Sequence, residues 1–501
     1  MTALFPPMLK KYAVLVTLAA ILALGAFLRF HKLEFNSFWL DEASSYYTSN
    51  APFSRVLGNL KSFDIHPPAY FLMLSRVIRY FGNSETALRF PSAAAGVLVI
   101  PAMFLLGRRL YSEKEGLIAA ALTAVSWSAV SLSREARAYE FLLLFTILSF
   151  YFLISLLRAL KENSDLPTGS AAGYILCAVI NSYLHYYGAY IIFLQALACL
   201  WLSRKKPPFF RAFLVFYLSI LVCYLPWLPS FIYQARHNRG NIAWLGNRNV
   251  LYEFFRYSFG VLHSKSAFIA LLAPFFFFLF SFLRGAFKHK EPARGFSFAN
   301  PDFFVLCWLT VPFALLYAES AVALPILGTR YLIIIFPAAC LIFARSITLL
   351  PLRAVYTSLV SILAVYLLLF NMVIVEKFYA EPCFPQVREP VKLMAALGPR
   401  FQNSLIILRA AAYMRIDVDY YFERLSIKKD YIDTEWNKDD AERIAKIIRE
   451  SKPEYVWLLN AGNAPGTGGA FEGYFSRDKL LLSRQYYQTG VELRKLAYPR
   501  G

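Results

Sequence analysis

Two adjacent carboxylates, Asp41 and Glu42, stand where the chain leaves its first long apolar segment, in the stretch FWLDEASSYY (38–47). A carboxylate held at a membrane face is partly removed from water, which makes it a stronger base than a solvated one. The alternative is that both are ordinary loop charges in contact with water. The elements around the pair, and the side of the membrane they occupy, decide between the two interpretations.

Residues that bind anions or transfer protons also gather in other short polar segments. Arginine suits a phosphate because its planar guanidinium makes paired, permanently charged hydrogen bonds. The segments are SFDIHPPAY (62–70), SREARAYE (133–140), LHYYG (184–188), YQARHNRGN (233–241) and LGTRYL (327–332). Each also has a simpler interpretation: Arg330 and Tyr331 as membrane-interface anchors, and the charges of 133–140 as surface ion pairs.

The composition places these segments in a membrane protein. Of 501 residues, 58% are hydrophobic and only 17% are charged, which excludes an ordinary soluble domain. The net charge of +20 does not indicate nucleic-acid binding, because the basic residues punctuate apolar runs. The six cysteines show no zinc-type spacing and imply no disulfide framework.

About eleven apolar runs approach the ~20 residues that cross a bilayer. They lie near 12–28, 90–107, 116–132, 138–157, 171–187, 189–203, 211–231, 266–283, 302–319, 329–347 and 353–375. Lysine and arginine concentrate in alternate loops, which predicts a cytoplasmic N-terminus. The segment 29–89 then lies outside, and its parts 41–62 and 67–82 are expected to form amphipathic helices at the outer interface.

The composition changes from about residue 378. Residues 403–410 and 453–460 have the pattern of strands, and 438–452 that of an amphipathic helix. The glycine-rich stretch 460–473 lacks the lysine and hydroxyl residue of a phosphate-binding loop. The expected fold is therefore mainly α: a polytopic membrane helix bundle (1–377) with outer juxtamembrane helices, and a small extracytoplasmic α/β domain (378–501).

Over roughly residues 10–375 the sequence resembles the GT-C superfamily of polytopic glycosyltransferases, in particular the branch of protein O-mannosyltransferases and aminoarabinose transferases. The motifs that carry the resemblance occur in the family's order: LDEASSYY, DIHPPAYFLML, ALRFPSAAAGVLVIPAMFLLGRRLY, SREARAYEFLLL and GTRYLIIIFPA. It implies an active site on the extracytoplasmic face of the cell (inner) membrane. It also implies a sugar donor linked to polyprenyl phosphate.

The resemblance makes Asp41 the candidate base, with Glu42 assisting or orienting it. Glycosyl transfer also needs a stabilised phosphate leaving group, and the candidates for binding it are Arg330, Tyr331, Arg137 and His66. Some relatives have a lysine in place of His66. Whether His66 binds the phosphate, the acceptor or a metal therefore stays undecided. The candidates for a second acid, for acceptor binding or for a metal site are Glu135, Glu140 and Asp64, and other outer-loop candidates are Tyr139, Tyr187, Arg236 and Arg239. The sequence identifies no cofactor, although Asp41 and Glu135 could share a divalent cation.

The expected function is inverting transfer of a sugar from a polyprenyl-phosphate donor to a hydroxyl of a glycan, lipid or protein acceptor. One alternative is a transporter or flippase for a lipid or anionic solute, although transporters usually place ionisable residues within their spans. Another is an oligosaccharide polymerase or ligase with a pyrophosphate-linked donor. The expected partners are the lipid-linked donor, the acceptor and membrane lipids, with no nucleic acid.

Overall fold

The computed structural model describes residues 7–237, 249–259, 265–288, 296–322, 326–396, 404–410, 415–427, 431–434, 438–461, 481–488 and 491–497. The chain forms two compact units, each described here by itself. Unit 1 comprises residues 1–31, 48–80 and 88–377, and unit 2 comprises residues 32–47, 81–87 and 378–501. Two pieces of the predicted first outer loop thus belong to the same unit as the C-terminal residues.

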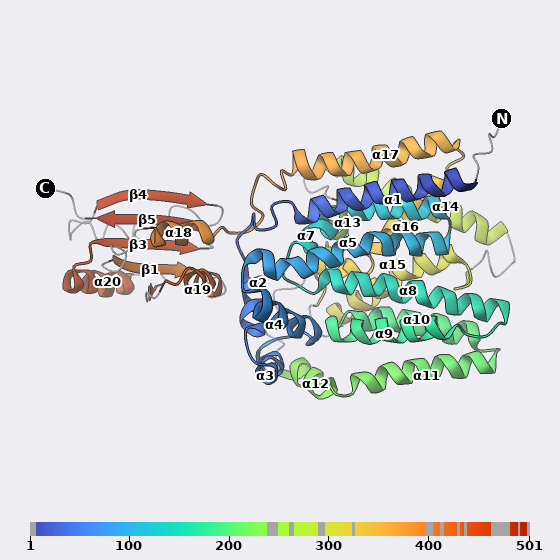
Figure 1. Cartoon of the computed structure of the whole chain (residues 1–501), viewed down its shortest axis with the longest axis horizontal. Coiled ribbons are helices and arrows are strands. Elements are labelled where there is room, and N and C mark those ends of the chain that lie inside the picture. The colour runs from blue at the N-terminus through green and yellow to red at the C-terminus, as the bar shows by residue number, and fades with distance from the viewer. Residues whose placement is uncertain are drawn as a thin grey trace. The chain divides into compact units, whose positions relative to one another are not determined.

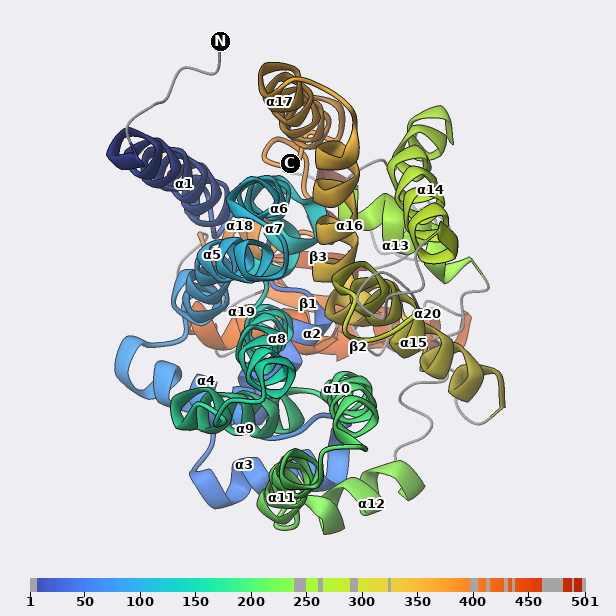
Figure 2. The ribbon, with the colours of Figure 1, turned by 90° about the vertical axis from the view of Figure 1, so that its right-hand side faces the viewer.

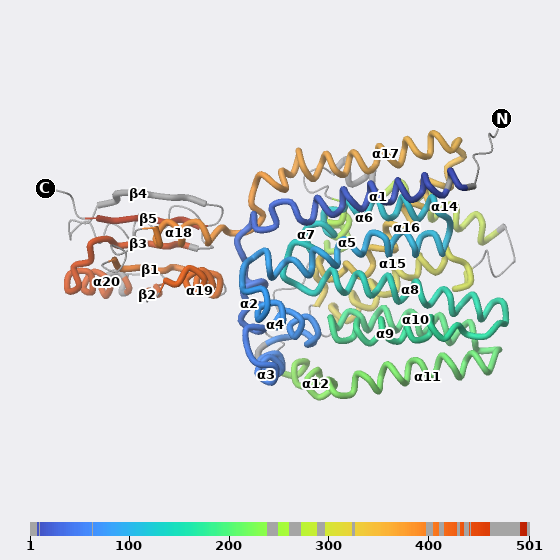
Figure 3. The backbone as a smooth tube through the Cα atoms, in the orientation of Figure 1, coloured from blue at the N-terminus to red at the C-terminus, as the bar shows by residue number. Residues whose placement is uncertain are grey.

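Unit 1 is a bundle of helices that run side by side (Figures 1 and 3) and are seen end-on in Figure 2. Its elements are α1 (Pro7–Phe30), α3 (Phe53–Phe63), α4 (Ala69–Phe81), α5 (Glu85–Leu110), α6 (Glu113–Val125), α7 (Trp127–Ser133), α8 (Tyr139–Glu162), α9 (Thr168–Leu184), α10 (Gly188–Ser203), α11 (Pro207–Tyr224), α12 (Leu228–His237), α13 (Val250–Phe259), α14 (Lys265–Lys288), α15 (Pro301–Val322), the 3-10 helix η2 (Thr329–Ile334), α16 (Phe336–Leu349), α17 (Ala354–Phe370) and the π-helical turn η3 (Asn371–Val375). Helix α2 (Leu40–Ser49) and the ends of α4 and α5 cross the boundary between the units. Every predicted apolar run is helical.

The long helices have the composition of membrane spans. Within the described residues, six helices are long and apolar enough to cross a membrane. The number is seven if α6 and α7, which are bent by 57°, form one span. Three further apolar helices are shorter than these spans: α10, the part of α14 between Leu272 and Phe287, and α16. Only 6% of the apolar window of α17 is buried, against 61% for α5 and α8, as expected where lipid covers the outer helices. The chain is a multi-pass membrane protein.

The bend between α6 and α7 sets the direction in which the chain enters the segment 133–140. Ser126 has an extended backbone and caps α7, and its hydroxyl donates to the backbone oxygen of Ser258 at 2.6 Å. Gly96 of α5 faces the end of α7, where a Cβ atom would come within 2.7 Å of Ser133 Cβ. The lack of a side chain at Gly96 therefore lets α5 and α7 approach closely.

The segment 41–62 was predicted as one amphipathic helix and forms two. Helix α2 ends at Ser49, and α3 begins after Pro52, which is its N-cap. Proline has no backbone N–H and disfavours a helical residue before it, so the helix breaks there. The amphipathic pattern is confirmed in α3 and α4, which bury Val56, Leu60 and Leu74 while Arg79 lies near the last turn of α4.

Unit 2 contains a five-stranded sheet with the order β2-β1-β3-β5-β4. Its elements are α18 (Arg388–Ala395), β1 (Ser404–Ala410), α19 (Arg415–Arg424), β2 (Tyr431–Asp433), α20 (Lys438–Ser451), β3 (Tyr455–Ala461), β4 (Leu481–Gln488) and β5 (Val491–Ala497). Strand β1 pairs in parallel with β2 and β3, and β5 pairs antiparallel with β3 and β4. Helix α20 buries Ile444 and Ile448 with Ile407 and Leu458 of the sheet.

The strands predicted at 403–410 and 453–460 and the helix predicted at 438–452 are confirmed. Most of the glycine-rich stretch, from residue 462 to 473, lies outside the described residues.

The positive-inside pattern predicts which parts of the chain a membrane-impermeant reagent can reach. In a background without native cysteines, Asn50→Cys and Lys446→Cys should react in intact cells, and Lys205→Cys should react only after the membrane is opened. All three side chains are exposed, so access depends on sidedness and not on burial. Labelling of Lys205→Cys in sealed cells would reverse the predicted orientation.

Candidate active site

A chain of three polar side chains links the loop before α4 to the turn before α8. Asp64 Oδ1 lies 2.6 Å from His66 Nδ1, and Arg137 Nη2 lies 3.1 Å from His66 Nε2. A guanidinium can only donate, so His66 Nε2 is the acceptor and Nδ1 carries the hydrogen toward Asp64. The arrangement orients His66 from both sides.

The negative charge of Asp64 is stabilised by its hydrogen-bonded neighbours. Burial alone would raise the pKa of its carboxyl group. The hydrogen bond from His66 Nδ1, the charge of Arg137 and the backbone N–H of Ile65 outweigh burial and lower the pKa below its ordinary value. Asp64 is therefore a carboxylate that accepts hydrogen bonds at neutral pH.

The turn that carries Arg137 is fixed by buried hydrogen bonds. Arg134 Nη1 donates to the backbone oxygens of Arg29, at 3.1 Å, and His31, at 2.6 Å, and so satisfies the C-terminal end of α1. Ser92 Oγ donates to the backbone oxygen of Arg137 at 2.9 Å. The interpretation of Arg134 and Arg137 as surface charges is wrong, because both side chains are buried.

Arg330 and Tyr331 extend the polar group from η2. Arg330 Nη1 lies 3.2 Å from Glu135 Oε2, and this carboxylate is buried while the arginine remains 27% exposed. The ring of Tyr331 lies 5.3 Å from that of His185 and 5.1 Å from that of Tyr187. The predicted candidates from 133–140, 184–188 and 327–332 thus meet in unit 1.

The two alternatives for the second acid differ in their surroundings. Glu135 pairs with Arg330, whereas Glu140 is fully buried in the first turn of α8. Neither carboxylate oxygen of Glu140 has a hydrogen-bond partner within the described part of the chain. Glu135 therefore belongs to the polar group, and Glu140 does not join it. Tyr139 does join it, with its ring 6.1 Å from that of Tyr331.

A cavity of about 650 Å³ opens beside this group among α9, α10, α11, α12 and α15. Most of its lining is apolar, including Ile192, Phe193, Leu200, Ile220, Leu221 and Phe231. His66, His185, Gln234 and Tyr331 also line it, and they are neighbours: the rings of His66 and His185 are 5.5 Å apart. Gln234 Nε2 donates to the backbone oxygen of Leu60 at 2.7 Å and so ties α12 to α3.

Comparisons with known proteins bear on this geometry. The sequence profile of the family described as dolichyl-phosphate-mannose-protein mannosyltransferase matches residues 65–233. The chain is similar to the crystal structure of the oligosaccharyltransferase of Archaeoglobus fulgidus, at 13% identity over 98% of this chain and 74% of that one, with a TM-score of 0.53. It is also similar to ArnT of Cupriavidus metallidurans bound to undecaprenyl phosphate, at 12% identity over 98% of this chain and 100% of that one, with a TM-score of 0.54. No curated protein matches the sequence.

The fold is that of the GT-C glycosyltransferases. The resemblance noted in the sequence is thereby confirmed for the fold. The matched residues 65–233 include His66, Glu135, Arg137, Tyr139 and Tyr187 of the polar group, whereas Asp64, Arg330 and Tyr331 lie outside the match.

The remaining candidates stand in other elements. Asp41 and Glu42 stand in the first turn of α2 and belong to unit 2, where Glu42 is fully buried and Asp41 is partly exposed. Arg236 is exposed in the last turn of α12. Arg239 lies outside the described residues.

The predicted metal site has no support in the geometry. Within the described ranges, no group of three or more His, Cys, Asp or Glu side chains could hold a metal ion. Glu135, one of the two residues expected to share a cation, is paired with Arg330.

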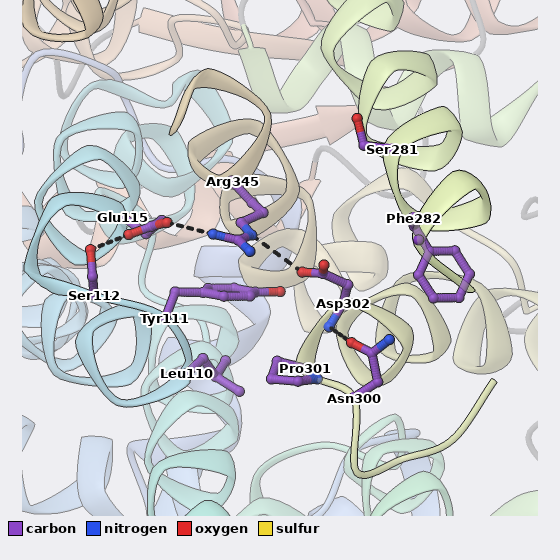
Figure 4. A pocket seen from close by; sticks show the side chains of 11 residues that line it. Leu110, Tyr111, Ser112, Glu115, Ser281, Phe282, Asn300, Pro301, Asp302 and Arg345 are labelled. Atoms are coloured by element: carbon purple, nitrogen blue, oxygen red, sulfur yellow. Dashed lines mark hydrogen bonds and ion pairs between the residues drawn. The ribbon is translucent and has the colours of Figure 1, made fainter. Parts of the chain in front are cut away.

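A second cavity of unit 1, of about 420 Å³, lies among the ends of α5, α6, α14, α15 and α16 (Figure 4). In it Arg345 lies between two carboxylates, with Nη1 2.9 Å from Glu115 and Nε 3.4 Å from Asp302. Ser112 and Thr348 complete the partners of Glu115. Arg345 pairs with both carboxylates and thereby joins α6, α15 and α16, so we interpret the network as structural.

Sequence reasoning missed two residues of the cavity, His185 and Gln234. Both stand in segments that were noted, but only their neighbours were singled out. His185 Nδ1 accepts the backbone N–H of Tyr187 at 3.2 Å, which leaves the hydrogen on Nε2. A histidine directly before a pair of tyrosines at a helix end was the available signal.

Proposed function

We propose that the protein is an integral-membrane glycosyltransferase that moves a sugar from a polyprenyl-phosphate donor to an acceptor hydroxyl at the outer membrane face. The observation that carries the proposal is the cavity of unit 1, whose apolar walls adjoin the Asp64, His66 and Arg137 chain and the Arg330 pair. A lipid phosphate needs both surfaces at once: an apolar slot for the isoprenoid and fixed cations for the phosphate.

In this proposal the arginines bind the phosphate. Arg137 and Arg330 carry permanent charges and planar donor groups, and each is already oriented by a partner, His66 and Glu135 respectively. Orientation before binding lowers the entropy lost when the donor binds. The crystal structure of ArnT with undecaprenyl phosphate supports the same class of ligand for this fold.

Asp41 is the proposed base, because it occupies the position that matches the family motif LDEASSYY. Its carboxylate takes the proton of the acceptor hydroxyl while the acceptor oxygen attacks the anomeric carbon. The bond between that carbon and the phosphate oxygen breaks, and its electron pair leaves with the polyprenyl phosphate. A single displacement of this kind inverts the anomeric configuration. Glu42 assists or orients Asp41.

The test is a direct comparison of two activities. Purified protein in detergent should transfer sugar from polyprenyl-phosphate monosaccharides to an acceptor, and the product should have the inverted configuration. Vesicles that contain the protein should show no solute uptake above empty vesicles. Uptake without transfer would favour the transporter alternative, and transfer only from pyrophosphate-linked oligosaccharides would favour the polymerase or ligase.

Replacing Arg330 should weaken binding of undecaprenyl phosphate. Arg330→Lys keeps the charge but loses the planar donor pair, and the loss of one charge-assisted contact costs roughly 1.5–3 kcal/mol. We expect the dissociation constant, measured by calorimetry in detergent, to rise by roughly 10-fold to 100-fold. Arg330→Ala should bind more weakly still.

Arg353→Lys is the matched control, because Arg353 is an exposed arginine at the N-cap of α17. It should bind undecaprenyl phosphate as the parent does. Equal affinities for the parent, Arg330→Lys and Arg330→Ala would mean that Arg330 is only a membrane-interface anchor and does not bind the phosphate.

A further inference from the structure

Gln234 is a buried glutamine of α12 whose side-chain amide joins several parts of unit 1. The residue is 4% exposed. Its Nε2 donates to the backbone oxygen of Leu60 at 2.7 Å and to that of His66 at 3.4 Å. Its Oε1 accepts from the Tyr186 hydroxyl, which in turn accepts from Trp227 Nε1 at 3.1 Å. Both the nitrogen and the oxygen of the amide are therefore in use.

The orientation of this amide is fixed by the chemistry of its partners. The two backbone oxygens can only accept, so the amide nitrogen faces them, and the amide oxygen faces the hydroxyl of Tyr186. A glutamate at this position would direct a carboxylate at two carbonyl oxygens. Position 234 thus needs a side chain that donates on one side and accepts on the other.

The two backbone oxygens lie at the ends of the segment that carries Asp64 and His66. Leu60 stands in the last turn of α3, and its oxygen also accepts the backbone N–H of Asp64, the C-cap residue, at 3.3 Å. Two prolines follow His66, and they have no N–H groups to donate. A backbone oxygen removed from water needs a donor. Gln234 supplies one at both ends of residues 60–66.

We propose that Gln234 is a positioning residue for donor binding: through the backbone of His66 it fixes the imidazole that orients Arg137 toward the lipid phosphate. This role rests on the proposed function and deepens it. His66 Nε2 lies 3.1 Å from Arg137 Nη2, so a shift of the His66 backbone moves the partner of that guanidinium. A displacement of about 1 Å can cost ~10²-fold in activity, even when its cause lies far from the chemistry.

Helix α12 also forms part of the cavity wall. Gln234 and Tyr186 line the cavity of unit 1 together with His66. A second contact between α12 and α3 lies beside the amide, where Lys61 Nζ is 5.6 Å from the ring centroid of Tyr233. Helix α12 therefore joins the apolar wall for the isoprenoid to the polar chain for the phosphate.

The test is the affinity of the full-length protein for undecaprenyl phosphate, measured by calorimetry in detergent. Gln234→Met keeps the length of the side chain and removes the amide. The dissociation constant should rise roughly tenfold, within the range that coupled neighbouring side chains show. Tyr186→Phe leaves Gln234 in place and removes only the hydroxyl that orients its amide. It should cause a smaller rise, and it tests the role of the amide even if Gln234→Met does not fold.

Gln195→Met is the matched control. Gln195 is a fully buried glutamine of α10 whose Oε1 accepts from the Tyr174 hydroxyl at 3.2 Å and whose Nε2 donates to Ser149 Oγ at 2.8 Å. These partners belong to α9 and α8, and Gln195 is not among the residues that line the cavity. Both glutamine variants lose buried hydrogen bonds and should unfold at a lower temperature. Only Gln234→Met should bind undecaprenyl phosphate more weakly.

His66→Ala supplies a readout that a general loosening of the bundle would not move. If Gln234 acts through His66, the affinity of the double variant Gln234→Met/His66→Ala should lie within about twofold of that of His66→Ala alone. Independent effects would instead multiply.

Three results would overturn the positioning role while the parent binds undecaprenyl phosphate. They are parental affinity in both Gln234→Met and Tyr186→Phe, equal losses of affinity in Gln234→Met and Gln195→Met, and independent effects in the double variant. A parent that neither binds undecaprenyl phosphate nor transfers a sugar from any polyprenyl-phosphate donor would contradict the proposed function itself.

Discussion

Replacing Asp41 by asparagine is expected to reduce sugar transfer by at least ~10²-fold, the lower end for a positioned acid or base. The amide keeps the size and hydrogen-bonding capacity of the carboxylate but cannot take the proton of the acceptor. Binding of undecaprenyl phosphate should survive, because we propose that the arginines of unit 1, and not Asp41, hold the phosphate. Transfer rate and binding affinity should be measured on the same purified variant, so that catalysis is separated from folding.

Glu42→Gln is the comparison, since it changes the neighbouring carboxylate in the same turn of α2. A milder loss of transfer is expected if Glu42 only orients Asp41. Transfer by Asp41→Asn at close to the parental rate would mean that the pair is ordinary loop charge and that the mechanism is wrong.

Replacing Glu85 by glutamine should strongly destabilise unit 2. Glu85 is 1% exposed and accepts from the Tyr421 hydroxyl at 3.0 Å, and its carboxylate pairs with Arg388, at 3.2 Å, and with Arg424. Removing one partner of a buried ion pair leaves an uncompensated charge and costs about 3–5 kcal/mol. We expect this decrease in the free energy of unfolding, measured by denaturant titration of the Trp457 fluorescence in the sheet of unit 2.

Glu389→Gln serves as the control for Glu85→Gln. Glu389 also pairs with Arg388, at 2.9 Å, but it is 41% exposed. Exposed ion pairs contribute only about 0–1 kcal/mol, so this variant should unfold close to the parent. Equal effects of the two substitutions would show that burial of Glu85 does not determine its contribution.

The helices of unit 1 could be predicted because their signal is local. An apolar run of about 20 residues satisfies its own backbone hydrogen bonds as a helix, whatever surrounds it. The break at Pro52 was equally readable, since proline disfavours a helical residue before it. It was missed because the amphipathic pattern continues across the break from α2 into α3.

The side-chain pairs of the candidate site could not be predicted from neighbouring residues in the sequence. Glu135 and Glu140 lie in the same short segment, and either could have been the second acid. The choice depends on Arg330, which stands 195 residues after Glu135. Arg137 and His66 were singled out for their chemical types, but their contact joins residues 71 apart.

The assembly of unit 2 had no signal in the sequence for another reason. The C-terminal residues carry little of the family resemblance, so no motif pointed to α19. The packing of residues 32–47 and 81–87 with residues 378–501 depends on side chains such as Phe38, Tyr420 and Glu85, and each of these alone is typical of any folded domain.

The assembly of unit 2 from distant segments sets an order of events during synthesis. Glu85 leaves the ribosome 303 residues before its partner Arg388. At about 5–20 residues per second the interval is roughly 15–60 s. Until then the carboxylate of Glu85 and the backbone N–H of Phe38 depend on water or on a chaperone for hydrogen bonds. The segment that carries Asp41 therefore gains its contacts with α19, such as that of Phe38 with Tyr421, only after residue 424 has been made. A ribosome stalled before α18 would leave the helices of unit 1 synthesised and Asp41, the proposed base, without these contacts.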